Sequence, residues 1–175
     1  MPLLTDLPSA SAPAGWKRSA DATDSRLHQL APYIGKLKPV IARELLEQFT
    51  TPGDLVLDCF SGSGTVPLEA ALLGRSVLAF DSNPYAVTLT RAKLEAPATL
   101  ESANAALDER LGAALARPMC ELDAVPEWVR KFFHPNTLQN AIRFADECIE
   151  RDDQFLFACL LGILHHQRPG FLSYP

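Results

Sequence analysis

The sequence predicts an α/β fold that is rich in helices and has few parallel strands. Three observations carry this prediction. Strand-forming residues occupy 55–57 and 76–80, a turn with two glycines follows the first run, and an apolar helical stretch at 65–74 joins the two runs. A strand, a crossover helix and a second strand in this order form a βαβ unit, whose two strands lie parallel. Only these two segments have the pattern of strands, so the expected sheet is small.

Helical patterns account for most of the remaining chain. Before the first strand, apolar residues recur every four positions and predict one helical face, formed by Leu37, Ile41, Leu45 and Phe49. Gly74 is expected to end the helix that follows the glycine turn. Asn83 is expected to cap the next helix, with Pro84 at its first position and Pro97 closing it. Residues 1–26 are rich in Ala, Ser, Pro and Asp and are expected to form a disordered tail.

The second half of the chain is predicted to be helical throughout. Residues 99–116 form one helix, and 127–133 form a short helical or irregular piece. A further helix starts at His134, with one face formed by Leu138, Ile142, Ala145 and Ile149. The last segment, 155–164, is apolar on every side and needs cover all round. The expected cover is the small sheet, a second copy of this chain, or a second chain.

Two aspartates are expected at one edge of the sheet. Asp58 follows the first strand and Asp81 follows the second. The carboxyl ends of parallel strands meet at the same edge, so both lie beside the glycine turn. Gly62 and Gly64 let the backbone approach a ligand, and a carboxylate in the place of Asp81 can accept two ribose hydroxyls. A dinucleotide site would have Gly or Ala where Pro67 stands, and no Gly-Lys-Ser/Thr string is present, which argues against NAD and ATP.

The string Asp58-Cys-Phe-Ser-Gly-Ser-Gly-Thr65 instead resembles motif I of the DNA amino-methyltransferases, whose usual form is Asp-Pro-Phe-x-Gly-Ser-Gly-Thr. Cys59 stands in the proline place and is expected to be a small buried residue. Residues 81–86 and 90–93 resemble the next block of that family. The spacing His28…Tyr33-x-x-Lys36-x-x-Pro39 resembles the segment before motif I. The resemblance covers residues 28–95 well and 130–170 loosely.

This resemblance implies a Rossmann-like methyltransferase fold that binds S-adenosylmethionine. Asp58 would lie near the methionine part of the cofactor, Asp81 would bind the ribose, and Asn83 would lie against the adenine. The other implied cofactor contacts are Phe60, Ser61, Gly62, Gly64, Thr65 and Ser82 around the turn, with Tyr33 and Lys36 at the methionine end. The implied reaction is methylation of the exocyclic amine of adenine or cytosine in DNA, as in restriction-modification. The alternatives are an RNA base as substrate, or a non-catalytic module that binds cofactor or packs against a partner.

The catalytic block of that family, a polar residue followed by Pro-Pro and an aromatic residue, is absent. The chain contains no Pro-Pro pair, and the nearest string is Ser173-Tyr-Pro175. A complete fold of this class resembles a seven-stranded sheet. We therefore expect the N-terminal part of a longer or split enzyme, inactive by itself. Its parts would be the tail, a cofactor-binding part at 27–96, and a helical segment at 97–175 that continues into a missing catalytic part.

Composition limits the partners and the compartment. The net charge is −5, whereas a chain that grips DNA alone is more often basic. DNA contact is therefore expected through the missing portion or a partner chain. The four cysteines lack the close spacing of a zinc site or a disulfide framework. No apolar run approaches the ~20 residues of a membrane span, so a cytoplasmic protein without a membrane segment is predicted.

Overall fold

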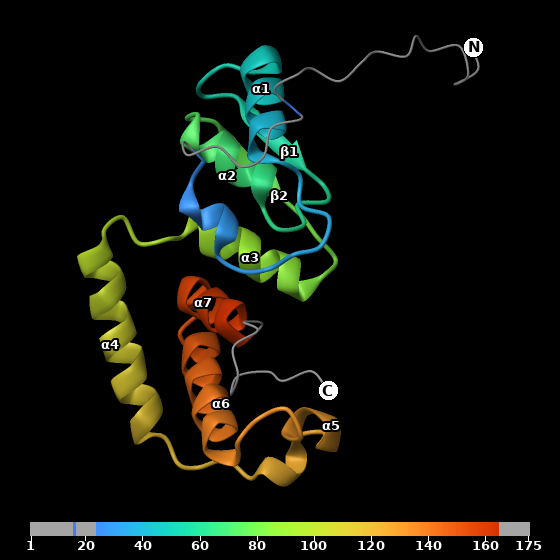
Figure 1. The fold of residues 1–175 in the computed structure, drawn as a ribbon. Helices are drawn as coiled ribbons and strands as arrows, with labels where there is room; N and C mark the ends of the chain where they lie inside the picture. Colours follow the sequence, from blue (N-terminus) through green and yellow to red (C-terminus); the bar gives the residue numbers. More distant parts are fainter. Residues whose placement is uncertain (1–15, 17–23, 165–175) are drawn as a thin grey trace.

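The computed structural model describes residue 16 and residues 24–164 of the chain (Figure 1). In chain order its elements are η3 (Arg26–Gln29), α1 (Pro39–Phe49), β1 (Leu55–Asp58), α2 (Thr65–Leu72), β2 (Ser76–Ala79), α3 (Pro84–Leu94), α4 (Leu100–Ala116), η4 (Leu122–Ala124), α5 (Glu127–Arg130), α6 (Pro135–Glu150) and α7 (Gln154–Leu164). None of the described helices is both long enough and apolar enough to cross a bilayer. Expectations for most of the tail and for the string 173–175 fall outside the described residues.

The sheet contains two parallel strands, as the sequence predicted. β1 pairs with β2 in a register that places Leu55 opposite Ser76 and Asp58 opposite Ala79. α2 is the crossover between them, and Gly74 follows its end with a φ of 77°, a conformation that glycine adopts at little cost. A small parallel sheet among many helices is consistent with the incomplete Rossmann-like fold that the sequence predicted.

One face of this sheet is bare. Side chains alternate between the two faces of a strand, and in β1 the positions of Leu55 and Leu57 are 63% and 60% exposed. Leu78 of β2 and Phe80, just after β2, lie on the same face of the sheet and are 49% and 58% exposed. The opposite face is covered by α2, whose buried residues include Leu68. The described part of the sheet therefore has an open apolar face and two unpaired edges.

The helix α1 is in the predicted place, but a different side of it is buried. Ala42 and Leu46 are the buried residues, and Leu45 and Phe49 of the predicted face are 38% and 72% exposed. The reason is that α1 packs mainly against α2 rather than over the whole sheet. The four-residue spacing identified a helix correctly and its contact surface incorrectly.

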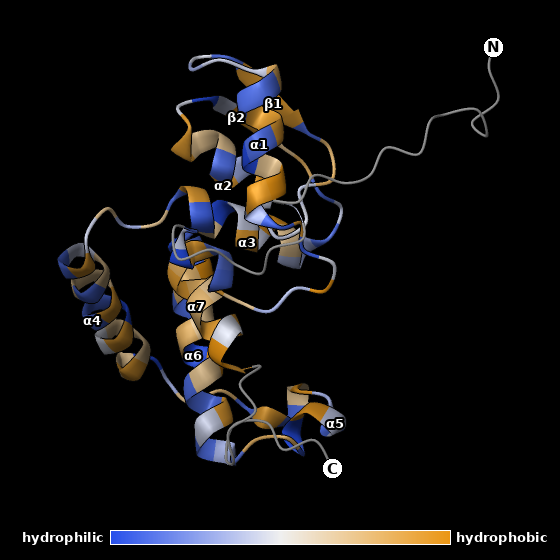
Figure 2. Cartoon of the chain, turned by 45° about the horizontal axis from the view of Figure 1, so that its top comes forward, coloured by the Kyte–Doolittle hydropathy of each residue, from blue (hydrophilic) through white to orange (hydrophobic). Residues whose placement is uncertain are grey.

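The helix α7 is covered by other helices of the same chain on two of its sides, and Ile163 remains 52% exposed. α7 packs along α3, where Ala158 joins a buried cluster with Ala31, Leu89 and Ala92. On the other side Leu156 and Leu160 pack with Phe144 and Cys148 of α6. Figure 2 shows the apolar colouring of α7 below α3 and beside α6. The sequence correctly predicted that α7 needs cover, but the sheet takes no part in it, because α3 lies between the sheet and α7 (Figure 1).

The lower helices leave an apolar groove. It has a volume of about 610 Å³ and is lined by α4, α6 and α7.

In α6 the buried side includes Leu138, as expected, whereas Ile149 of the predicted face is 55% exposed. Two charged residues, Arg143 and Glu147, are buried instead. Arg143 donates to the carbonyl of Leu115, and Glu147 accepts from Arg117 and Arg151, so these polar groups join α6 to the end of α4 and to its own last turn.

Candidate cofactor site

The glycine turn between β1 and α2 has a backbone that requires glycine at two positions. Gly62 and Gly64 have φ angles of 52° and 74°, in the left-handed region. A Cβ atom on Gly64 would lie 2.8 Å from the Cα of Thr90 in α3, a distance that side chains do not tolerate. The N–H of Gly64 donates to the carbonyl of Ser61 at 2.7 Å and closes the turn. The turn is therefore pressed against α3 and held in one shape.

Asp81 joins the end of β2 to this turn. Its Oδ2 accepts a hydrogen bond from the N–H of Gly62 at 2.8 Å, and its Oδ1 accepts from the N–H of Asn83 at 2.9 Å. These N–H groups, Asn83 first and then Gly62, lower the pKa of the carboxyl, so Asp81 is ionised at neutral pH. A carboxylate offers about four acceptor positions, and the hydrogen bonds from Gly62 and Asn83 take two of them. Asp81 thus has the chemistry needed to bind two hydroxyls.

Asn83 caps α3, as the sequence predicted. Its Oδ1 accepts from the N–H of Tyr85 at 3.0 Å, which satisfies one of the free donors at the start of the helix. Asn83 and its neighbour Ser82 are both exposed, beside the Asp81 carboxylate. The solvent-facing atoms of Ser82 and Asn83 are therefore available to a ligand that binds beside Asp81.

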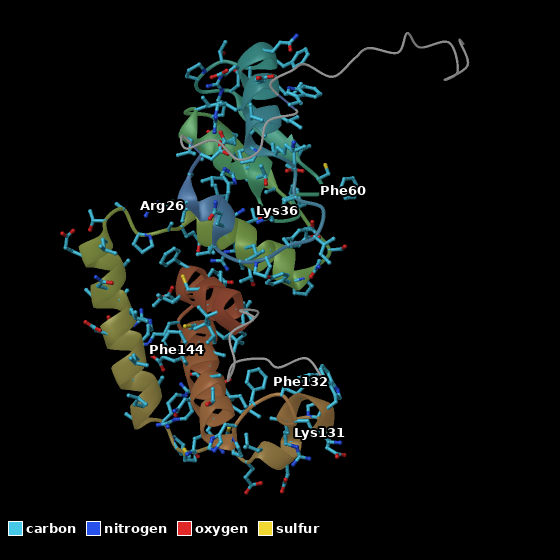
Figure 3. All side chains as sticks on the ribbon, viewed as in Figure 1. Arg26, Lys36, Phe60, Lys131, Phe132 and Phe144 are labelled. Carbon is cyan, nitrogen blue, oxygen red and sulfur yellow. The ribbon has the colours of Figure 1, made fainter. Side chains whose placement is uncertain are left out.

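The first residues of the turn point outward. Asp58 Oδ1 accepts from the N–H of Phe60 at 3.1 Å, which bends the chain directly after β1. The side chain of Phe60 is 89% exposed and projects away from the ribbon (Figure 3). Cys59 is exposed, so the expectation of a small buried residue there is wrong. The physical reason is the bare side of the sheet, which leaves nothing to cover the position that follows β1.

The middle of the turn points inward. Ser61 and Thr65 are buried, at 7% and 4% exposure. The hydroxyl of Thr90 donates to Ser61 Oγ at 3.2 Å, and Thr65 Oγ1 lies 3.4 Å from Ser63 Oγ. The N-cap of α2 is Gly64, which has no side-chain oxygen to cap the helix. Ser61 and Thr65 therefore hold the shape of the turn from inside.

The segment before α1 closes one end of the turn. The ring of Tyr33 lies 3.4 Å from the place of a Cβ on Gly62 and stacks on Tyr85, with ring centroids 6.0 Å apart. Tyr85 in turn donates to the carbonyl of Pro32 at 2.7 Å. Lys36 donates to the carbonyl of His28 at 3.0 Å. The structure thus brings Tyr33 and Gly62 together, although they lie far apart in sequence.

Sequence reasoning missed a buried ionic cluster that anchors this segment. Glu69 of α2 is 1% exposed, and its two oxygens contact His28 Nε2 at 2.7 Å and Arg43 Nε at 2.8 Å. Arg43 also binds Asp24 at 3.0 Å. The available signal was an acidic residue among apolar neighbours in the glycine-turn helix. The cluster fixes the segment that carries Tyr33 onto the helix that starts at the glycine turn.

Comparisons with known proteins point to DNA methylases. The model of the DNA methylase family N6_N4_Mtase matches residues 20–92. The Type II methyltransferase M.MjaII of Methanocaldococcus jannaschii is 29% identical over 69 residues, which cover 39% of this chain and 13% of that protein. The Type II methyltransferase M1.MboII of Moraxella bovis is 47% identical over 67 residues, which cover 38% of this chain and 25% of that protein.

A relative of another kind also matches part of this chain. The ribosomal protein L11 methyltransferase of Geobacillus kaustophilus is 43% identical over 53 residues, which cover 30% of this chain and 17% of that protein. No solved structure matches the chain significantly. The matched segments span a quarter or less of each of these relatives. The family match includes the glycine turn, Asp81 and the segment with Tyr33, so residues 20–92 of this chain are similar to the N6_N4_Mtase family of DNA methylases.

Proposed function

We propose that this chain carries the S-adenosylmethionine binding site (here called the seat) of a DNA methyltransferase that acts on the exocyclic amine of adenine or cytosine. The observation that carries the proposal is the hydrogen bond from Gly62 to Asp81. It places an ionised carboxylate with free lone pairs directly beside a glycine turn, at the carboxyl edge of the strands. This is the place where ligands bind in open α/β sheets. The seat is assigned to residues 27–96, and the described residues 97–164 form the helical segment that packs beneath it.

The proposed contacts follow from the positions of the side chains. Asp81 accepts the two ribose hydroxyls, Asn83 and Ser82 lie along the adenine, and the turn at Gly62 receives the backbone of the amino-acid part. Asp58 lies near the methionine end, where Tyr33 and Lys36 close the site. Gly64, Ser61 and Thr65 act by holding the turn, and Phe60 forms the outer rim. The cofactor supplies an activated methyl group, and the residues of this chain bind and orient it.

The bare sheet face supports a second part of the proposal. Leu55, Leu57, Leu78 and Phe80 form an exposed apolar surface next to unpaired strand edges. Such a surface is stable in water only when further strands or helices cover it. We propose that the covering polypeptide, in the same or a second chain, carries the Pro-Pro-aromatic block and the DNA contacts. The target base would be flipped into it, because stacking hides the amine in a duplex.

The substrate class is inferred from the family match. Two Type II methyltransferases and a ribosomal protein L11 methyltransferase each match 53 to 69 residues of this chain. The family match with DNA methylases favours DNA over RNA. The four cysteines are free thiols, which suits the reducing cytoplasm where DNA modification in bacteria takes place.

The Asp81→Ala variant is expected to lose cofactor affinity. Isothermal titration of the unmodified chain with S-adenosylmethionine should give a dissociation constant in the micromolar range. Removal of an ionised acceptor that binds two hydroxyls should weaken binding by about 30-fold or more. The matched control is Asp123→Ala, which removes an aspartate that is 95% exposed and pairs with Arg130 at the far end of the molecule. Equal affinity of the Asp81 and Asp123 variants would contradict the proposed seat.

A methyl-transfer assay distinguishes an inactive cofactor-binding fragment from a complete enzyme. With labelled cofactor and unmethylated duplex DNA, this chain alone should transfer no methyl group above the blank. The reason is that no Pro-Pro-aromatic string is present to bind the amine. Turnover by this chain alone would refute the proposed absence of the catalytic block. A folded chain that binds no cofactor would instead support the non-catalytic packing module.

A further inference from the structure

A lysine is buried directly behind the glycine turn. Lys93 of α3 is 4% exposed, and its ammonium donates to the carbonyl of Ser63, in the middle of the turn. Among residues 24–164, no carboxylate forms an ion pair with it. Burial, and then the positive charge of Lys36, lower the pKa of Lys93 to about 8. A lysine buried without a counter-ion is unusual, because a desolvated charge is costly unless something compensates it.

The second lysine adds to the same field. Lys36 is exposed, and its charge opposes that of Lys93 strongly enough to lower the pKa of the buried group. The carbonyl of His28 accepts one of its hydrogen bonds, which keeps the ammonium near the segment that covers the turn. Two like charges at one end of the turn repel each other. A ligand that brings a negative charge there relieves this repulsion.

The position of Lys93 in α3 is fixed by the same contacts that shape the turn. Thr90, one helical turn earlier, donates to Ser61 Oγ and touches the backbone at Gly64. Thr90 and Lys93 therefore form one face of α3 that holds the turn from Ser61 to Gly64. Because the turn is thin, a charge on its inner side acts on a ligand at its outer side through little intervening water.

We infer that Lys93 makes the seat selective for ligands with a carboxylate, by holding the Ser63 carbonyl and by placing an unpaired positive charge behind the turn. The inference rests on the proposed function and extends it, since the ligand class is an adenosine joined to an amino acid. Lys93 is a positioning residue with an electrostatic role, and it forms no direct contact with the reacting methyl group. The ligand carboxylate is the partner of the Lys36 and Lys93 charges.

The test compares two ligands that differ in the carboxylate. S-adenosylhomocysteine carries the amino-acid part, and 5′-methylthioadenosine lacks it. The Lys93→Met variant keeps the length of the side chain and removes its charge. We expect it to bind S-adenosylhomocysteine about tenfold more weakly and methylthioadenosine within about twofold of the unmodified chain. Lys93→Arg, which keeps the charge, should restore part of the difference between the two ligands.

Each result decides the inference. If Lys93→Met weakens both ligands equally, the lysine only shapes the turn and the charge role is refuted. If the unmodified chain binds neither ligand, the proposed function fails and the inference fails with it. Should Lys93→Met not fold, as judged by circular dichroism, Lys93→Gln, which keeps an N–H donor near the Ser63 carbonyl but carries no charge, provides the same comparison. It should weaken S-adenosylhomocysteine about tenfold and methylthioadenosine by no more than about twofold, and an equal effect on both would refute the inference.

Discussion

The Glu69→Gln variant should unfold with a free energy about 3 kcal/mol lower than that of the unmodified chain. Glu69 is 1% exposed and binds both His28 and Arg43. The amide of glutamine keeps the shape of the side chain but lacks the charge. Its NH₂ group is a donor, so it cannot accept the hydrogen bond from Arg43 or His28 that a carboxylate oxygen accepts. Breaking a buried ionic cluster by removing one member costs ~3–5 kcal/mol, and the lower end applies because Arg43 is 26% exposed. Urea denaturation followed by circular dichroism measures the loss.

A surface pair provides the matched control. Glu95 binds Arg91 one helical turn away at 2.9 Å, with its side chain 46% exposed. Glu95→Gln makes the same chemical change where water screens the charges, so it should cost less than ~1 kcal/mol. If the Glu69 and Glu95 variants lose the same stability, the buried cluster contributes no more than a surface pair and this account of it is wrong.

The same carboxyl predicts a pH dependence. Burial works to raise the pKa of Glu69, but hydrogen bonds from His28 and Arg43 outweigh it and leave the pKa below its ordinary value of 4.5. A lowered pKa in the folded state means that the stabilisation is complete above about pH 4.5 and is lost as the pH falls through the folded value. The stability difference between the unmodified chain and Glu69→Gln should therefore narrow below pH 4.5. A difference that stays constant down to pH 3, about a unit and a half lower, would contradict this assignment.

The Gly162→Ala variant should also lose about 3 kcal/mol, for a steric reason. A Cβ at Gly162 of α7 would lie within 2.3 Å of the carbonyl oxygen of Leu30, which is a backbone atom that cannot swing away. Either α7 or the segment after η3 must move, and overpacking of this kind costs ~1–3 kcal/mol or more. That movement would also disturb Ala31 and Ala158 in the cluster beneath α3. Thermal unfolding of the variant checks the expected loss.

The control for this substitution is another helical glycine. A Cβ added at Gly112 of α4 would have no neighbouring atom within 4 Å, so alanine fits there without contact. Gly112→Ala should raise stability by up to ~1 kcal/mol, because alanine favours the helix over glycine. The two changes are chemically identical and have opposite expected signs. A loss of stability at Gly112, or none at Gly162, would contradict the packing described for α7.

The sequence predicted the local parts of the site because its signals are local. The alternation of strand formers, the two glycines and the Asn83-Pro84 pair each determine the backbone within a few residues. The order strand, helix, strand then requires that Asp58 and Asp81 lie at one edge. The structure confirms the parallel pair and the cap on α3. The roles of the side chains in binding a cofactor remain predictions.

The sequence could not predict what depends on contacts between distant segments. The buried side of α1 is decided by α2, which covers Leu46 and leaves Phe49 exposed. The burial of Glu69 depends on His28 and Arg43 from two other segments, and the exposure of Cys59 depends on the bare face of the sheet. Periodicity shows that a helix has an apolar side, but the partner that covers it is a property of the whole fold. Lys93 belonged to a recognised string, and only the fold places it behind the glycine turn.

The most direct test of the central claim is a map of backbone amide shifts in the chain on addition of S-adenosylmethionine. The account predicts that the amides of Gly62, Asp81 and Asn83 shift together and saturate with one dissociation constant. The amides that line the groove between α4, α6 and α7, such as those of Leu107 and Ile163, should stay in place. Shifts confined to that groove, or none at the glycine turn at millimolar cofactor, would show that this edge of the sheet is not a cofactor seat.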